Sequence, residues 1–145
     1  LDAKREWGHA RDYIEMQWLM LQQIKPDDYI IATGRMASVR DFIQICSKKL
    51  GWGVNKNNNG IIWEGKGTKE IGRRADNGEI IIRIDERYFR PTEVDELCGD
   101  SSKARDKLGW VPKITLEELA AEMILFEMKE SKKELFINKN NFKKN

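Results

Sequence analysis

The sequence predicts a small mixed α/β domain, because short isoleucine-rich runs alternate along it with longer amphipathic segments that carry capping residues. The isoleucine-rich runs cover residues 28–33 and 79–85, and the amphipathic segments cover residues 11–23, 39–50 and 116–130. The chain has 145 residues, of which 40% are hydrophobic, so it is long enough for one domain with a core. We therefore expect helices packed against a small sheet.

The first half of the chain begins with a helix over residues 11–23, where apolar side chains recur at helical spacing and a proline follows the end. Residues 28–33, Asp-Tyr-Ile-Ile-Ala-Thr, are a short apolar run bounded by Asp and Gly, which predicts a buried strand. A second helix is expected over residues 39–50, because Ser38 stands at its N-cap and Asp41 at the position of a capping-box acid.

The middle of the chain predicts strands separated by turns. Residues 51–60 are rich in Gly and Asn, a composition typical of an exposed loop. Residues 60–74 are expected to hold one short strand and then a loop punctuated by glycines, and residues 79–85 a second buried strand. No function is assigned to residues 52–78 beyond an exposed connection.

Two helices are expected in the last third of the chain. A pair of serines, at positions 101 and 102, can cap a short helix that ends at Gly109. Thr115 and Glu118 form a capping box for a long helix over residues 116–130. The expected order of elements is helix, strand, helix, strand, strand, helix, helix.

The net charge of +2 hides an uneven distribution. Residues 129–145 carry six Lys and two Glu, which leaves 20 of the 26 basic and 22 of the 24 acidic side chains for residues 1–128. Because the body is slightly acidic, we expect no nucleic-acid partner. Residues 1–130 are expected to form the folded portion, and residues 131–145 a basic, disordered tail.

Several other classes are disfavoured by composition. The mean hydropathy is −0.65, and no apolar run approaches the roughly 18 residues of a membrane-spanning helix, so no membrane partner is expected. Cys46 and Cys98 lie far apart in sequence, which predicts free thiols in a reducing cytoplasm. One His and two separated Cys cannot supply a structural zinc site. Trp7, Trp18 and Trp110 are expected in the core rather than as stacking platforms for a base.

Familiar catalytic motifs are missing from the sequence. The glycines of residues 51–53 and 65–67 lack the spacing that brings a helix N-terminus onto a pyrophosphate, and no Tyr is followed four positions later by Lys. A nucleophilic pair of His9 with Cys46 or Cys98 is disfavoured, because both cysteines fall at helix or helix-edge positions typical of small core residues. We therefore expect no catalytic groups within this chain.

Two arginines stand in unusual surroundings. Arg5 precedes a Trp-Gly-His turn that opens a helix, where a guanidinium and the helix N-terminal amides can share an anion. In Arg-Tyr-Phe-Arg-Pro-Thr-Glu, Pro91 restricts Arg90 to an extended backbone and Glu93 follows near a first helical turn. An arginine beside a carboxylate suits a ligand that carries both phosphate and hydroxyl groups. A surface ion pair between Arg90 and Glu93 is the alternative from composition alone.

A more specific pattern extends from Leu1 to about Lys129, with residues 52–78 much less constrained. It comprises REWGHARDYIEMQWLMLQQ, IATG, SVRDFI, RYFRPTEVDELCGDSSKARDKLGW and PKITLEELAAEM. These segments resemble the C-terminal portion of the GDP-mannose 4,6-dehydratase family, within the extended short-chain dehydrogenase/reductase superfamily. The resemblance implies that this chain is the small mixed α/β substrate-binding domain of such a protein, and that the N-terminal Rossmann domain lies outside it.

The resemblance also implies an activity for the complete protein. In this family a Rossmann domain holds NADP and the catalytic Thr, Tyr, Lys and Glu. C4 of the hexose is oxidised by hydride transfer to NADP, water is removed across C5 and C6, and the hydride returns at C6. The product, GDP-4-keto-6-deoxymannose, leads to GDP-fucose or GDP-rhamnose. The expected partners are GDP-mannose, the Rossmann domain and further copies in a homo-oligomer, and the 145-residue chain alone is expected to be an inactive part of this lyase.

The same resemblance assigns roles to five residues. Arg5 and Arg90 would bind the diphosphate, and Glu93 would contact the GDP-sugar. Val39 and Arg40 match a helix start near the nucleotide, where capping and packing explain them equally well. No catalytic, cofactor-binding or metal-binding residue is assigned. Two alternatives remain: a stand-alone nucleotide-sugar binding module that uses the same residues, and a protein-interaction module whose long C-terminal helix binds a partner.

Overall fold

The structure, a computed structural model, describes residues 1–53, 60–88, 90, 94 and 96–141. The helices of this part are α1 (Ala10–Leu21), α2 (Val39–Lys49), α3 (Ser102–Leu108) and α4 (Leu116–Asn141), and the strands are β1 (Lys4–Glu6), β2 (Met36–Ser38), β3 (Ile61–Glu64), β4 (Ile71–Arg74) and β5 (Ile80–Arg83). Two short 3-10 helices cover Gly67–Lys69 and Glu86–Tyr88. The predicted mixed α/β class is confirmed.

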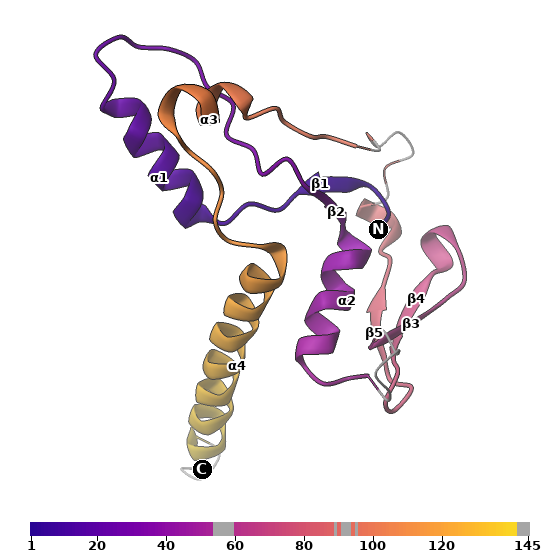
Figure 1. Ribbon diagram of the computed structural model, residues 1–145. Helices are drawn as coiled ribbons and strands as arrows, with labels where there is room; N and C mark the ends of the chain where they lie inside the picture. Colours follow the sequence, from indigo (N-terminus) through magenta and orange to yellow (C-terminus); the bar gives the residue numbers. More distant parts are fainter. Residues whose placement is uncertain (54–59, 89, 91–93, 95, 142–145) are drawn as a thin grey trace.

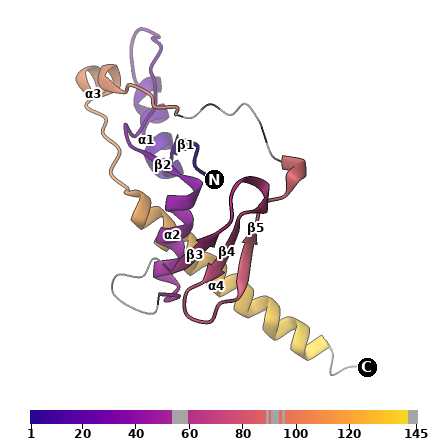
Figure 2. The ribbon, with the colours of Figure 1, turned by 90° about the vertical axis from the view of Figure 1, so that its right-hand side faces the viewer.

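The elements are arranged in two groups (Figure 1). Helices α1 and α3 lie together at one end, whereas α2, the start of α4 and the three-stranded sheet lie at the other, as the rotated view also shows (Figure 2). The antiparallel pair β1–β2 and the segment before α4 connect the two groups. The second sheet is an antiparallel meander in the order β3-β4-β5.

The predicted helix ends are confirmed where local hydrogen bonds define them. At the start of α2 the hydroxyl of Ser38 accepts from the N–H of Asp41, and the Asp41 carboxylate accepts from the N–H of Ser38. Thr115 and Glu118 form the same reciprocal pair at the start of α4. Gly109 ends α3 with a left-handed φ of 67°, a conformation that costs a glycine little.

The cap of α3 differs from the expectation. The side chain of Ser101 makes no capping hydrogen bond to this helix. The carboxylate of Asp100 instead accepts from the backbone N–H of Ser102 at 2.9 Å and from its hydroxyl. The side chain of Asp or Ser can accept a hydrogen bond from a backbone N–H at the start of a helix. The sequence therefore did not show whether Asp100 or Ser101 would cap α3.

The strand predicted over residues 28–33 is wrong for this chain. The segment pairs with no strand of the described residues, and the first ladder is instead between Lys4–Glu6 and Met36–Ser38. A strand requires a neighbour for its backbone groups, and an apolar run does not by itself provide one.

The loop predicted after β3 contains a further strand, β4. It pairs with β3 and β5, and the turn between β4 and β5 holds Asp76, Asn77 and Gly78. Gly78 has a φ of +75° and donates its N–H to the carbonyl of Arg74 at 2.9 Å. The sequence contained a signal for this hairpin, because an Asn-Gly dipeptide stands between two runs of residues that favour strands.

Helix α4 is longer than predicted. It continues through residues 131–141, which were expected to be disordered because of their basic composition. Residues 132–135 are Lys, Lys, Glu and Leu, which have high helix propensity, and extending an existing helix costs less than starting one. Lys133 and Glu130 also form an i, i+3 pair at 3.4 Å. The division of the chain at residue 130 stays a prediction.

The core lies between α1, α3 and the segment after α3. Met16, Ala104 and Trp110 are buried there, and the Trp110 Nε1–H donates to the carbonyl of Asp12 at 3.0 Å. The buried Asp12 carboxylate accepts from the N–H groups of Lys113 and Ile114, at 3.0 and 2.9 Å. These bonds hold the approach to α4 against α1, because a buried carboxylate must be hydrogen-bonded.

The other two tryptophans differ in their surroundings. Trp7 stacks on Phe42, with ring centroids 4.6 Å apart, and its Nε1–H donates to the carbonyl of Ala37 at 2.9 Å. This confirms the structural role expected for Trp7 and, with the preceding contacts, for Trp110. Trp18 lies on the outer surface of α1, where its side chain is 59% exposed, so its predicted place in the core is wrong for this chain.

Candidate functional site

Strand β1 brings Arg5, the first predicted diphosphate ligand, to the segment that follows Arg90. The Arg5 Nη1 donates to the carbonyl of Val94 at 2.8 Å. Next to it, Lys4 forms a parallel β-bridge and a 2.8 Å ion pair with Glu96. Two motifs separated by most of the sequence therefore meet at one edge of β1.

Arg90 is exposed at the beginning of this segment. Four residues of chain span at most about 14 Å, so the Cα of Arg90 lies within that reach of Val94, which Arg5 contacts. Pro91 and Glu93 lie outside the described residues, and their predicted roles stay predictions.

Glu6 holds this arrangement together. Its carboxylate accepts from the N–H of Gly34 at 2.5 Å and from the hydroxyl of Thr33 at 3.3 Å. It also accepts from the N–H of Gly99 at 3.2 Å. One side chain beside Arg5 thus connects β1 to the turn before β2 and to the end of the segment that follows Arg90. Glu6 was not among the residues predicted for the site, although it lies between Arg5 and the Trp-Gly-His turn.

Arg40 is engaged by acidic side chains. Its guanidinium donates to Asp2 at 2.7 and 3.1 Å and to Glu70 at 2.7 and 3.0 Å. It also lies 4.5 Å from the ring centroid of Trp63. The hydrogen bonds from Arg40 lower the pKa of Asp2. Val39 is exposed as the first residue of α2. Arg40 would have to leave these partners to bind a ligand, so the structure favours its packing role.

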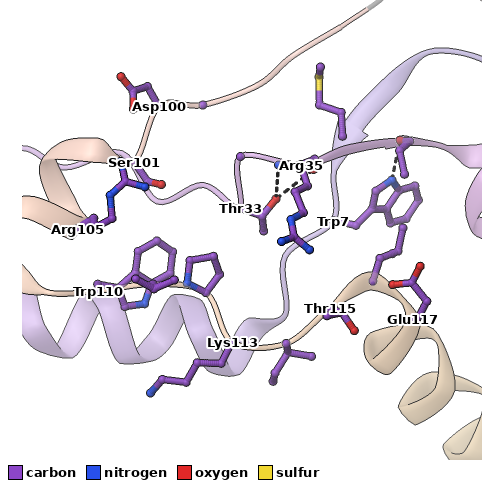
Figure 3. A pocket seen from close by; sticks show the side chains of 18 of the residues that line it. Trp7, Thr33, Arg35, Asp100, Ser101, Arg105, Trp110, Lys113, Thr115 and Glu117 are labelled. Atoms are coloured by element: carbon purple, nitrogen blue, oxygen red, sulfur yellow. Dashed lines mark hydrogen bonds between the residues drawn. The ribbon is translucent and has the colours of Figure 1, made fainter.

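A cleft of about 750 Å³ lies between the two groups of elements. Its walls come from several separate segments of the chain: Trp7, residues 33–37, Asp41 and Ile45 of α2, residues 99–102, Arg105 and residues 110–117. Figure 3 shows Arg35 reaching into the space from the segment before β2. Among the described residues no carboxylate pairs with the Arg35 guanidinium.

The other cations of the cleft have partners. Arg105 donates to the hydroxyl of Ser102 at 3.1 Å, and the Lys113 Nζ lies 2.6 Å from Glu15. The sequence did not predict this cleft, because its lining residues form no local motif and meet only through the fold. The cleft is a second place where a described arginine could bind an anion.

NADP does not fit the part of the chain that the structure describes. Its sheets are small and antiparallel, and β2, which runs directly into α2, places the Ser38–Asp41 capping box at the helix N-terminus instead of a glycine-rich turn for a pyrophosphate. Within the same residues, no group of His, Cys, Asp and Glu side chains is arranged to hold a metal ion. None of the helices described has the length and apolar character to cross a bilayer.

Comparison with known proteins identifies the family. The family model described as GDP-mannose 4,6 dehydratase matches residues 1–123. The chain is 44% identical to a GDP-mannose 4,6-dehydratase of Yersinia enterocolitica, with 98% of this chain and 39% of that protein covered. It is 48% identical to the one from Vibrio cholerae, over 89% of this chain and 36% of that protein. The human protein is 47% identical, over 86% of this chain and 32% of its own length.

This chain therefore belongs to the GDP-mannose 4,6-dehydratase family. It spans about a third to two-fifths of the length of these curated relatives. The predicted family is confirmed.

Proposed function

We propose that this chain is the C-terminal, GDP-sugar-binding portion of a GDP-mannose 4,6-dehydratase. Membership of the family and the partial coverage of its relatives support this proposal. The contact between Arg5 and the carbonyl of Val94 is the single observation that carries it, since it brings the two arginine motifs to one place.

In the proposed site, Arg5 and Arg90 bind the diphosphate of GDP-mannose. Each charge-assisted hydrogen bond to a phosphate oxygen contributes roughly 1.5–3 kcal/mol. A planar guanidinium can contact two oxygens at once, which fixes the orientation of the diphosphate. Glu93 would accept hydrogen bonds from hydroxyl or base donors of the GDP-sugar. Contacts of Val39 and Arg40 with GDP-mannose also stay predictions, and the proposal depends on them less than on Arg5 and Arg90.

The chemical step belongs to the rest of the protein in this proposal. When bound there, NADP would supply hydride exchange with the sugar, and the same portion would hold the catalytic side chains. The complete protein would convert GDP-mannose to GDP-4-keto-6-deoxymannose, whereas the 145-residue chain would not. Turnover of GDP-mannose by the chain alone with added NADP would contradict this division.

Calorimetry with GDP-mannose tests the site. The sample is the protein translated from the complete reading frame that contains this chain. We expect Arg90→Ala to weaken binding about 10-fold to 100-fold, because one charge-assisted contact is lost. Arg35→Ala is the matched control: it removes the same charge from the cleft, and we expect no change in affinity.

The two arginine variants separate the two candidate anion sites. Loss of affinity in Arg35→Ala with unchanged affinity in Arg90→Ala would move the diphosphate into the cleft. Equal binding by both variants and the parent would contradict a diphosphate role for either arginine. Circular dichroism of each variant checks that the fold is retained.

We also propose that the complete protein is a cytoplasmic homo-oligomer. The exposed apolar side chains of the chain, on α1 and α4 among other places, are consistent with extensive contacts to other parts of an assembly. Analytical ultracentrifugation of the complete protein should show a mass that is a multiple of its chain mass. A monomer at micromolar concentration would contradict the assembly.

A further inference from the structure

The last turns of α4 project away from the rest of the molecule. They extend beyond α2 and the three-stranded sheet (Figure 1), and the rotated view shows the same projection (Figure 2). Every residue from 131 to 139 is exposed, and this segment lies beyond residue 123, where the match to the family model ends. Because short helices without packing contacts are only marginally stable in water, a partner that covers this segment would stabilise it.

One side of this part of α4 combines apolar and basic side chains. Residues at positions i, i+3, i+4, i+7, i+10, i+11 and i+14 share one side of a helix. Counted from Leu125, these positions hold Leu125, Met128, Lys129, Lys132, Leu135, Phe136 and Lys139, which we call the basic stripe. Leu125, Leu135 and Phe136 are 73%, 60% and 69% exposed, so the stripe is open to a partner.

The acidic side chains of the same region lie on the other side of the helix. Glu127, Glu130 and Glu134 are spaced i, i+3, i+7, and Glu127 is about 200° around the helix axis from Leu125. The 3.4 Å ion pair between Lys133 and Glu130 lies off the stripe. No carboxylate of the described residues pairs with a lysine of the basic stripe. The stripe therefore presents positive charge that this part of the chain does not neutralise.

The position of the lysines within the stripe indicates what binds it. Lys132 stands between Met128 and Leu135, in the middle of the stripe instead of at its border. A lipid bilayer would receive the middle of an apolar side in its acyl region, and interfacial helices accordingly keep their lysines on the polar side. A second copy of the stripe would bring ammonium groups together, which is unfavourable. A helix that carries both apolar side chains and carboxylates matches both features of the stripe.

We propose that the basic stripe binds an acidic amphipathic helix of another protein. The apolar members of the stripe would pack on an apolar row of that helix, and Lys129, Lys132 and Lys139 would pair with carboxylates that flank the row. This inference goes beyond the proposed function and does not depend on it, since β1, which carries Arg5, lies away from the end of α4 (Figure 1).

Fluorescence anisotropy with a designed peptide tests the proposal. The sample is the protein translated from the complete reading frame that contains this chain. The labelled probe is a helical peptide of about three heptads with Leu at positions a and d and Glu at positions e and g, and its matched control carries Lys in place of each Glu. We expect the acidic peptide to bind and its affinity to fall at least about 10-fold between about 50 and 500 mM salt, because salt screens the ion pairs. The basic peptide should not bind.

Two pairs of substitutions test the stripe itself. Lys132→Glu should weaken binding of the acidic peptide by about 10-fold or more, since it replaces an attraction with a repulsion. Lys133→Glu, the same charge change one position outside the stripe, should weaken it less than about 3-fold. Phe136→Gln should weaken binding about 10-fold through the lost aromatic contact, whereas Ile137→Gln, off the stripe, should not. Circular dichroism checks that each variant keeps its helix content.

Several outcomes would overturn the proposal. If the parent protein does not bind the acidic peptide, the stripe is covered by the preceding portion or does not recognise such a helix. Binding to vesicles of phosphatidylcholine with about 30% phosphatidylserine, without binding to the peptide, would assign the stripe to a membrane surface. A change in the sedimenting mass of the protein in Lys132→Glu would assign it to a second copy. Unchanged peptide binding in Lys132→Glu would contradict only this inference, and unchanged GDP-mannose binding in Arg90→Ala only the proposed function.

Discussion

The carboxylate of Glu6 accepts a hydrogen bond from the backbone N–H of Gly99, 93 positions later in the chain. The same carboxylate also accepts from the N–H of Gly34. Because β1 carries Arg5 next to Glu6, these bonds fix the position of Arg5 relative to the end of the segment that begins at Arg90. A site built from distant motifs depends on such cross-connections.

Replacement of Glu6 should therefore destabilise the chain. Glu6→Ala leaves two backbone donors without their acceptor, and we expect the free energy of unfolding to fall by about 1–3 kcal/mol. Glu6→Gln keeps one acceptor oxygen and should cost less. Urea unfolding measures both, with the exposed Glu127→Ala on α4 as the control. Equal stability of Glu6→Ala and Glu127→Ala would contradict this role.

Gly99 is required by close packing rather than by backbone conformation. A side chain at this position would collide with Ala32, as its Cβ would lie 2.6 Å from the Cβ of Ala32. We expect Gly99→Ala to lower the free energy of unfolding by about 1–3 kcal/mol, as overpacking does. The double variant with Ala32→Gly should recover part of this loss in thermal unfolding. No recovery would indicate that another contact excludes the methyl group.

The Arg40–Glu70 pair should contribute more than an exposed pair. The two side chains are 24% and 12% exposed, and the pair is bidentate. A double-mutant cycle with alanine should give a coupling energy of about 1–3 kcal/mol. The cycle for Arg73 and Glu64, an exposed pair, should give less than about 1 kcal/mol. A larger coupling for the exposed pair would contradict this ranking.

Acid should weaken the helix cap of α2. Hydrogen bonds from the N–H and hydroxyl of Ser38 lower the pKa of Asp41 below its usual value of about 3.9. A carboxyl group with a lowered pKa in the folded state stabilises the fold above its unfolded pKa, and this contribution is lost as the pH falls through the folded pKa. Chemical unfolding between pH 7 and pH 2 should show this loss, and Asp41→Asn should reduce the pH dependence. An unchanged slope in Asp41→Asn would contradict it.

Local features of the fold were predictable from the sequence. The capping boxes at Ser38 and Thr115 and the end of α3 at Gly109 are confirmed, because each depends on residues within a few positions of one another. The missed strand β4 also had a local signal in Asn77-Gly78, which was interpreted as part of a loop. Helix α4 continues past residue 130 because extending an existing helix costs little. The amino-acid composition of residues 131–141 does not show this.

Long-range features were not predictable in the same way. Residues 28–33 have the composition of a buried strand, yet strand formation depends on a partner that the described chain does not contain. The exposed position of Trp18 was not predictable either, because a periodic pattern marks an apolar side of a helix without saying what covers it. The sequence also did not show that Asp2 and Glu70 pair with Arg40, whose predicted contact with the ligand stays a prediction.

By itself the sequence determined the family, the α/β class and the residues expected to bind a diphosphate, since these are properties of motifs and local patterns. Only the tertiary structure decided that Arg5 contacts Val94, that Glu6 connects β1 to Gly99, and that a cleft opens beside Arg35. The physical reason is that hydrogen bonds and cavities between distant segments depend on how the elements pack, whereas caps and turns depend on neighbours along the chain.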